Sequence, residues 1–271
     1  MVSVTDLRRD TAPETPRRPT RRPVAIVVLV VALVAGAGAL GLWAGRSTAP
    51  GPPPASVGNA FDRAVPASVL ALPLVDQQGA TTSLASYRGR IVLVAPFLTS
   101  CQEVCPITTG ALLQVRQALA AAGLGDRVVV AEVTVDPGRD SPARLAAYAQ
   151  RTGVRFPLLT GSPATLDALW RFFGVDHTVV PEDSPPGIDW ETGQPYTYDV
   201  DHGDGFLMLD GRGHERFATG GLPHLQGALA PSLQAMLDGQ GRQNQSSPGP
   251  GAWTVGDALD AIGWIEGRAV P

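Results

Sequence analysis

The stretch RIVLVAPFLTSCQEVCP, residues 90–106, joins a continuous apolar run to two closely spaced cysteines. Residues 90–98 have the composition of a buried strand, and a helix is predicted over Pro106–Ala122 because proline suits a first helical turn. The cysteines therefore lie where a strand ends and a helix begins. Since a helix N-terminus offers unpaired N–H groups and partial positive charge, we expect lowered pKa values for Cys101 and Cys105.

Outside this stretch, strand patterns alternate with helix patterns. The further predicted strands are residues 68–76, 127–135, 156–160, 205–209 and 214–218, and the further predicted helices are residues 142–153, 164–173 and 224–238. This alternation predicts βαβ units with a parallel core, and the last two strands predict an antiparallel edge. We therefore expect an α/β fold with a thioredoxin-like sheet that carries the cysteines at the C-terminal end of a central strand.

Composition divides the chain into five segments. They are a basic cytoplasmic N-terminus (1–22), a transmembrane helix (23–45), a Pro- and Gly-rich linker (46–60), a thioredoxin-like domain (61–240), and a linker with a C-terminal tail (241–271). In that tail, Thr254 and Asp257 resemble a capping box. The sequence leaves two alternatives open: a tail helix that docks on the domain, or a frayed tail.

The segment 23–45 contains no charged residue and is long enough to cross a bilayer as a helix. Six arginines precede it, so the N-terminus is predicted to be cytoplasmic and the following domain extracytoplasmic. A cleaved signal peptide is the alternative, but its apolar region is usually shorter. Under either interpretation the domain works outside the cytosol.

Charge argues against a nucleic-acid binder. Residues 1–46 hold seven arginines against three acidic residues, whereas residues 47–271 hold fourteen arginines against twenty-two acidic residues. An acidic domain without a basic stripe is a poor match for a phosphate backbone.

Cys101 and Cys105 are the only cysteines in the chain, so a disulfide-rich scaffold is excluded. Their four-residue spacing places both sulfurs on one side of a first helical turn, where they could form a disulfide or bind a soft metal ion together. Two thiolates suit Cu(I), whereas a closed zinc site needs four ligands. An inert disulfide at this spacing would close almost no loop and add little stability.

His202 is the candidate for a third ligand. In a thioredoxin-like fold, the loop that enters the strand 205–209 lies beside the cysteine turn, so a histidine there could approach both sulfurs. Asp199, Asp201 and Asp204 could orient its ring. A solvent-exposed loop histidine is the open alternative, and the other histidines are interpreted as structural or exposed: His177, His214 and His224.

Three motifs together resemble the Sco/SenC copper-chaperone family over about residues 61–240. Cys101-x-x-x-Cys105-Pro106 follows an apolar strand, residues 135–142 read VDPGRDSP, and Asp201-His202 precedes another apolar strand. The resemblance implies copper coordination by Cys101, Cys105 and His202. It also implies a role in metallating the dinuclear copper centre of cytochrome c oxidase subunit II or a similar copper protein.

The same resemblance places Asp136 near the site, with Asp201 beside the histidine; a capping role for Asp136 is equally open. Two features depart from the family pattern. The family commonly has proline after the first cysteine, where this chain has Gln102, which predicts a looser turn with altered redox tuning. The polar segment 174–204, here called the insert, is long and acidic, and is either specific to a partner or simply solvated.

Other functions remain open from the sequence. The first alternative is a thiol-disulfide oxidoreductase that reduces the recipient's cysteines through Cys101 and Cys105 without carrying copper. A peroxidase would need a hydroxyl and an arginine beside the cysteine. Thr99 and Ser100 are adjacent, but no arginine can be assigned from the sequence. A copper or redox sensor has only the insert in its favour.

Overall fold

Strands β4 (Ile91–Phe97) and β5 (Val128–Thr134) form the centre of the sheet in the computed structural model, which describes residues 50–270. They pair in parallel along their whole length, and every residue of both strands is buried. Near-continuous apolar runs are expected of strands that are covered on both faces. The strand predictions for 90–98 and 127–135 are therefore confirmed.

The sheet has eight strands in the order β1-β10-β9-β4-β5-β6-β2-β3. Strand β6 (Leu158–Thr160) runs parallel to β5, whereas β9 (Phe206–Leu209) runs antiparallel to β4. Strand β10 (His214–Thr219) is antiparallel to β9. The order β10-β9-β4-β5, with a helix between β4 and β5, is a thioredoxin-like arrangement. It confirms the predicted α/β class, with a parallel core and an antiparallel edge.

Short strands complete the two edges. Strand β1 (Asn59–Ala64) pairs with β10, and β2 (Leu74–Asp76) pairs with β6 and with β3 (Thr81–Thr82). All side chains of β1 are exposed, so it has no apolar alternation that could predict it. The strand predicted over 68–76 is only partly correct, because helix α2 (Ala67–Leu70) occupies its first half. Pro73, which has no N–H for a ladder, separates the two elements.

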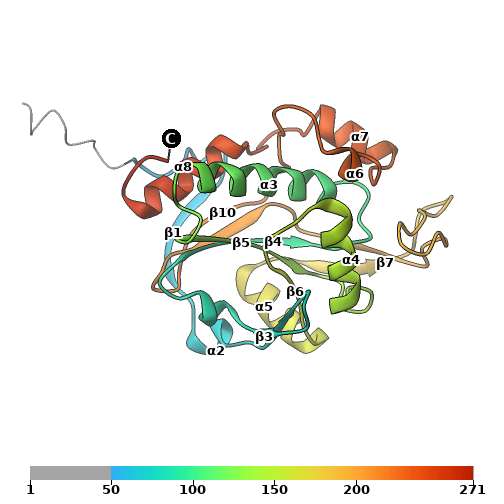
Figure 1. The fold of residues 1–271 in the computed structure, drawn as a ribbon, viewed down its shortest axis with the longest axis horizontal. Helices are drawn as coiled ribbons and strands as arrows, with labels where there is room; N and C mark the ends of the chain where they lie inside the picture. The colour runs from blue at the N-terminus through green and yellow to red at the C-terminus, as the bar shows by residue number, and fades with distance from the viewer. Residues whose placement is uncertain (1–49, 271) are drawn as a thin grey trace, which may run out of the picture. The chain divides into compact units, whose positions relative to one another are not determined.

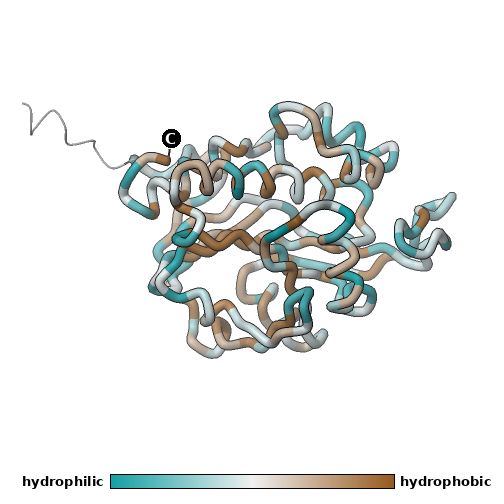
Figure 2. The backbone as a smooth tube through the Cα atoms, in the orientation of Figure 1, coloured by the Kyte–Doolittle hydropathy of each residue, from teal (hydrophilic) through white to brown (hydrophobic). Residues whose placement is uncertain are grey.

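Helices cover both faces of the sheet, as Figure 1 shows. Helix α3 (Cys105–Ala121) packs against α6 (Pro231–Gln234) and α8 (Val255–Glu266) on one face. On the other face α2 packs against α5 (Pro163–Phe173), and a 3-10 turn spans Leu84–Tyr87. Hydrophobic residues gather on the strands between these layers (Figure 2).

The capping residues explain where the helices begin and end. Helix α4 (Pro142–Thr152) begins after Ser141, whose hydroxyl accepts a hydrogen bond from the Arg144 N–H at 3.3 Å. It ends at Gly153, which adopts a positive φ of 80° that favours glycine. These boundaries match the predicted helix 142–153.

The helix predicted over residues 224–238 is wrong. Gly227 has a φ of 94°, and Ala230 is extended because it precedes Pro231. A helix can therefore begin only at Pro231, and α6 lasts one turn. A second short helix, α7 (Gly239–Ser246), then begins after Asp238, whose carboxylate accepts a hydrogen bond from the Gly241 N–H at 2.6 Å.

Packing does not end at the predicted domain boundary of residue 240. Trp253 is fully buried and stacks edge-on against Phe206 of β9, with the ring centroids 4.8 Å apart. Helix α8 buries Ala258, Ala261 and Ile262, and its predicted capping box is present. The tail therefore contains a helix that packs against α3, and residues beyond 240 contribute to the same core.

The N-terminal predictions lie outside the described residues. These are the basic segment 1–22, the transmembrane helix 23–45 and the first four residues of the linker, 46–49. Between residues 50 and 270, no helix combines the length and the apolar character that a membrane span requires.

Candidate metal centre

The cysteine turn, residues 101–105, connects the C-terminal end of β4 to the N-terminus of α3. Cys105 is the first residue of the helix and is buried, whereas Cys101 is half-buried. The Cys101 sulfur accepts hydrogen bonds from the backbone N–H groups of Val104 at 3.4 Å and of Cys105 at 3.3 Å. The structure holds both residues as free cysteines, so the Cys101–Cys105 disulfide of an oxidised form stays a prediction.

The two sulfurs have opposite acid–base behaviour. The hydrogen bond with Cys105, aided by His202, holds the pKa of Cys101 well below its usual value despite burial. Burial, together with the neighbouring Cys101 thiolate, raises the pKa of Cys105 well above its usual value. The lowered pKa expected from the helix N-terminus is therefore found for Cys101 and is wrong for Cys105, because burial and the negative charge of Cys101 both disfavour a second thiolate.

His202 completes the group. It is the last residue of β8 (Asp199–His202), and its Nε2 atom lies 3.8 Å from the Cys105 sulfur. The donor atoms of Cys101, Cys105 and His202 all lie within 4.8 Å of one another. The structure therefore brings the three predicted residues together, and their role as ligands stays a prediction.

The protonation of His202 follows from its surroundings. Burial lowers the pKa of His202, but the hydrogen bond and the charge of Cys101 outweigh it and raise the pKa to about 9. Its Nδ1 atom lies 2.9 Å from the Gly203 carbonyl oxygen. An Nδ1–H that donates to this carbonyl keeps Nε2 directed toward the sulfurs.

The aspartates predicted to orient this ring do not contact it. Asp201 is exposed, and the Asp199 carboxylate accepts a hydrogen bond from the Val200 N–H at 2.7 Å. Burial raises the pKa of Asp204 to about 6, and His202 acts on it only through its charge. Among the hydrogen bonds of residues 50–270, the Gly203 carbonyl takes the role expected of the aspartates.

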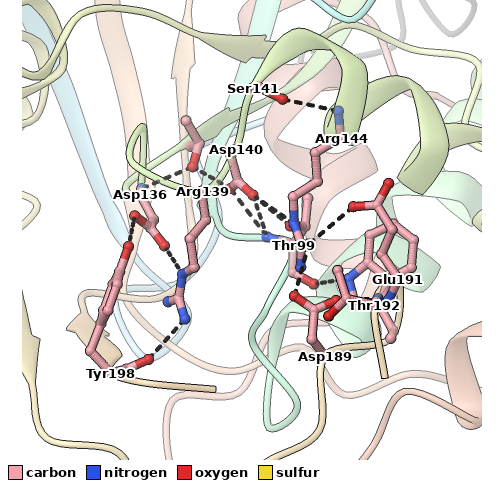
Figure 3. Close-up of polar contacts among 12 residues, drawn as sticks. Thr99, Asp136, Arg139, Asp140, Ser141, Arg144, Asp189, Glu191, Thr192 and Tyr198 are labelled. Carbon is pink, nitrogen blue, oxygen red and sulfur yellow. Dashed lines mark hydrogen bonds and ion pairs between the residues drawn. The ribbon is translucent and has the colours of Figure 1, made fainter. Parts of the chain in front are cut away.

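Asp136 lies at the end of β5 and acts on the strand that carries His202. Its carboxylate accepts hydrogen bonds from the Tyr198 hydroxyl at 3.0 Å and from the Arg139 guanidinium (Figure 3). Arg139 also donates to the Tyr198 carbonyl at 2.8 Å. Because Tyr198 directly precedes β8, this triad fixes where the histidine strand starts.

Asp140, from the same VDPGRDSP motif, supports the cysteine strand, and the sequence analysis missed it. Its fully buried carboxylate accepts hydrogen bonds from the hydroxyls of Thr99 and Thr134, both at 2.5 Å, and from the Thr99 N–H at 3.2 Å (Figure 3). Burial raises the pKa of Asp140 to about 6, although the hydrogen bonds with Thr134 and Thr99 oppose this shift. The motif itself was the signal that could have identified Asp140. This residue acts on the cysteine turn through Thr99, which precedes Cys101 by two positions.

The insert is anchored to the same region. Its strand β7 (His177–Val180) pairs with β8, and the Trp190 indole donates to the Thr99 carbonyl at 2.7 Å. Arg144 of α4 forms ion pairs with Asp189 at 2.9 Å and with Glu191 at 3.1 Å (Figure 3). The insert is therefore packed against the cysteine strand.

Gln102 joins the insert to the cysteine turn. Its side-chain amide donates to the Ile188 carbonyl at 3.2 Å, and its own carbonyl accepts a hydrogen bond from the Asp238 N–H at 3.1 Å. A turn held on two sides by these hydrogen bonds does not have the looseness that the missing proline predicted.

A cavity of about 680 Å³ opens beside the three donors, between the turn and the insert. Cys101 and His202 line it, and no arginine does. Its acidic lining residues are Glu103, Glu182, Asp183, Asp199, Asp201, Asp204 and Asp238. Burial, with the negative charge of Cys101 and the nearby aspartates, raises the pKa of Glu103 to about 7.

The remaining histidines lie elsewhere. His177 Nε2 is 3.0 Å from the Asp167 carboxylate, His214 Nδ1 is 2.7 Å from the Asp62 carboxylate, and His224 is exposed. Within residues 50–270, none of these joins a group of donor atoms close enough to hold a metal ion.

The peroxidase reading can be tested against the same geometry. An arginine does reach Thr99, because Arg144 Nε donates to its hydroxyl at 2.6 Å. However, Thr99 is fully buried and its hydroxyl also bonds to Asp140, so it cannot face a peroxide at Cys101.

Comparisons with known proteins give consistent relatives. Protein SCO2 homolog, mitochondrial, of Bos taurus is 33% identical over 137 residues, which cover 50% of this chain and 47% of that protein. The SCO2-like protein RP587 of Rickettsia prowazekii is 25% identical over 187 residues, 69% of this chain and 85% of its own length. A Stutzerimonas stutzeri protein described as copper-binding is 29% identical over 114 residues, 42% of this chain and 53% of its own length. The chain thus spans about half the length of the mammalian relatives it matches.

Two solved structures are similar in the same region. Bradyrhizobium japonicum ScoI with copper bound has 22% identity, a TM-score of 0.47, and coverage of 66% of this chain and 94% of that one. Apo Sco1 of Thermus thermophilus has 27% identity, a TM-score of 0.43, and coverage of 59% and 81%. The SCO1/SenC family model matches residues 68–221, which is more than half of the 271-residue sequence. The chain therefore belongs to the SCO1/SenC family.

Proposed function

We propose that this protein binds one copper ion through Cys101 Sγ, Cys105 Sγ and His202 Nε2 and delivers it to another copper protein. The observation that carries the proposal is the convergence of these three donors within 4.8 Å, although His202 is 97 residues away from Cys105 in the chain. Two sulfurs and one imidazole form a soft donor set that suits Cu(I). A structural zinc site would need a fourth ligand.

The two cysteines differ in exposure and in pKa, and this difference supports an order in which they bind copper. Cys101 is half-buried, lines the cavity and is held as a thiolate by the hydrogen bond with Cys105 and by His202, so it can meet incoming copper first. Cys105 is 2% exposed and gives up its proton only when the metal arrives. A recipient's thiolate could displace the copper from the Cys101 side, by ligand exchange through the open cavity.

Family membership supports a recipient, and the apolar N-terminal segment supports a location. The recipient we propose is the dinuclear copper centre of cytochrome c oxidase subunit II, or a similar copper protein. In our proposal the apolar segment 23–45 anchors the chain as a single membrane span. The copper domain then lies on the extracytoplasmic side, where its recipient would also be.

Copper binding is tested with the reduced full chain in competition with a chromophoric Cu(I) chelator. We expect tight one-to-one binding that is lost or strongly weakened in Cys101→Ala, Cys105→Ala and His202→Ala. The exposed His224 provides a matched control, because His224→Ala removes an imidazole that is not near the sulfurs. Equal affinity in His202→Ala and His224→Ala would exclude the third ligand.

Delivery is tested separately, by mixing the copper-loaded chain with the metal-free copper domain of subunit II. We expect copper to move to the recipient, whose dinuclear centre should show its absorption bands after one-electron oxidation with added ferricyanide, and not with the Cys101→Ala variant. Tight binding without transfer would leave a copper-binding protein and refute the delivery step.

A thiol-disulfide oxidoreductase is a second candidate, favoured by the contrast between the Cys101 thiolate and the Cys105 thiol. Such a pair can attack a recipient's disulfide through Cys101 and resolve the mixed disulfide through Cys105, which oxidises this chain and reduces the recipient. The measurement is reduction of the recipient's disulfide by the metal-free protein. It would be retained in His202→Ala, unlike copper binding.

A further inference from the structure

The peptide group between Glu103 and Val104 is contacted at both ends. Its N–H, on Val104, donates to the Cys101 sulfur at 3.4 Å, and its carbonyl, on Glu103, accepts a hydrogen bond from the Asn244 side-chain amide at 3.4 Å. A peptide group is planar and rigid, so the orientation of its oxygen also sets the direction of its N–H. Asn244 of α7 is therefore linked to the sulfur through a single peptide plane.

Helix α7 also touches the neighbouring peptide group. The Asp238 N–H donates to the Gln102 carbonyl at 3.1 Å, and Gly241 lies directly against the turn. A Cβ at Gly241 would lie 2.3 Å from the Gln102 oxygen and 3.1 Å from Glu103 Cα. Only glycine allows this backbone-to-backbone contact.

The amide of Asn244 is itself held in place. Its Oδ1 atom accepts a hydrogen bond from the Gln240 side chain at 2.9 Å, which leaves Nδ2 directed at Glu103. The Asp238 carboxylate fixes the first turn of α7 through the Gly241 N–H. Helix α7 lies beyond residue 221, where the match to the family model ends.

We infer that α7 is a positioning element for the cysteine turn, in which Asn244 and Gly241 hold the 103–104 peptide N–H on the Cys101 sulfur. The inference rests on the proposed function only where copper affinity is measured, and the redox equilibrium of the cysteine pair tests it independently. A hydrogen bond at the carbonyl polarises the peptide and strengthens its N–H as a donor. A donor on the sulfur stabilises the reduced thiolate, and therefore both copper binding and the reduced form of the cysteine pair.

The test is Asn244→Asp in the full chain, which keeps the shape of the side chain and replaces the donor with a negative oxygen. We expect the Cu(I) affinity to fall about tenfold, as is typical when a group that orients a metal ligand is removed. We also expect the Cys101–Cys105 disulfide to become about threefold harder to reduce in a glutathione equilibrium, since one hydrogen bond to the reduced form is weakened. Asn244→Gln, which keeps a donor, should recover part of both effects.

Gln243→Ala is the matched control, because Gln243 is an exposed residue of the same helix and, within residues 50–270, its side chain makes no hydrogen bond to the turn. Gly241→Ala is an independent second variant, with Gly256→Ala as its control, since a Cβ at Gly256 meets only Thr254 Oγ1 at 3.5 Å. If Asn244→Asp and Gly241→Ala change thermal stability alone and match their controls in both readouts, the inference is wrong. If the wild-type chain binds no copper, the proposed function fails, while the glutathione equilibrium still decides the role of α7.

Discussion

At the scale of single residues, two of the three candidate ligands are protonated in the metal-free protein at neutral pH. His202, with a pKa of about 9, holds a proton at neutral pH, and so does Cys105, whose pKa is raised by burial. Cys101 is the thiolate that stabilises the charge on the histidine. A copper ion that takes all three donors must therefore displace the protons of His202 and Cys105.

Copper affinity should therefore increase with pH. Because binding releases protons, we expect the apparent Cu(I) affinity to rise by about tenfold per pH unit for each proton released as the pH approaches about 9. The His202→Ala variant should bind more weakly and show a shallower pH dependence. Chelator competition across this pH range gives the slope, and a slope that is the same in both proteins would contradict the assignment.

A buried glutamate in the core gives a separate dependence of stability on pH. Glu132 of β5 is fully buried and accepts a hydrogen bond from the Thr109 hydroxyl at 2.8 Å. Burial raises its pKa from the ordinary 4.5 to about 8, although Thr109 opposes the shift. The folded protein therefore keeps a proton that the unfolded chain loses between these two pH values.

This difference fixes the sign of a stability prediction. The stabilisation by protonated Glu132 is complete below about pH 4.5 and is lost as the pH rises to about 8, at up to about 1.4 kcal/mol per pH unit. Glu132→Gln imitates the protonated form, so the free energy of unfolding of the variant should exceed that of the wild type increasingly toward pH 8. Urea unfolding at several pH values measures this, and parallel curves for the two proteins would refute it.

At the scale of elements, the C-terminal segment contributes to the main core. Trp253 lies between β9 and the start of α8 and is fully buried against Phe206. Helix α8 packs along α3, the helix that begins at Cys105. Loss of this packing should therefore weaken the whole domain.

We expect Trp253→Ala to lower the free energy of unfolding by about 3–5 kcal/mol, the usual cost of removing a large buried aromatic side chain. Trp264 of α8 is only half-buried, so Trp264→Ala should cost clearly less. Denaturant unfolding of the two variants compares these costs. If the two variants lose equal stability, the burial of Trp253 is not what stabilises the domain.

At the scale of the whole molecule, charge is unevenly distributed. The chain has a formal net charge of −4, yet seven carboxylates and no arginine line the cavity beside the sulfurs. A concave surface with charges of one sign concentrates its electrostatic field and attracts ions of the opposite sign. The cavity should therefore speed the capture of a cationic copper complex.

We expect the association rate of a Cu(I)–acetonitrile complex to fall as the ionic strength rises. The double change Glu182→Gln/Asp183→Asn, in the insert, should lower the rate by about two- to fivefold at low salt. Asp126→Asn/Asp260→Asn removes two exposed charges outside the cavity and should leave the rate unchanged. Stopped-flow kinetics compares them, and equal rates in the two double variants would show that the cavity does not steer copper.

Local signals in the sequence determined the framework of the domain. Continuous apolar runs predicted β4 and β5 because a doubly covered strand has no polar face. Ser141, Gly153 and the capping box at Thr254 predicted helix ends because capping depends on residues a few positions apart. The cysteine spacing and the position of His202 before a strand made these three residues candidate ligands but left an exposed His202 open, and the structure brings their donor atoms together.

Only the tertiary structure decided what surrounds those ligands. The contacts of Asp140 with Thr99, of Gln102 with Ile188 and of Asn244 with Glu103 join residues 41, 86 and 141 positions apart. Such contacts leave no periodicity, spacing or capping pattern that links the two partners. The sequence alone therefore determined the fold class and the candidate ligands, and folding decided how the insert and α7 hold the cysteine turn.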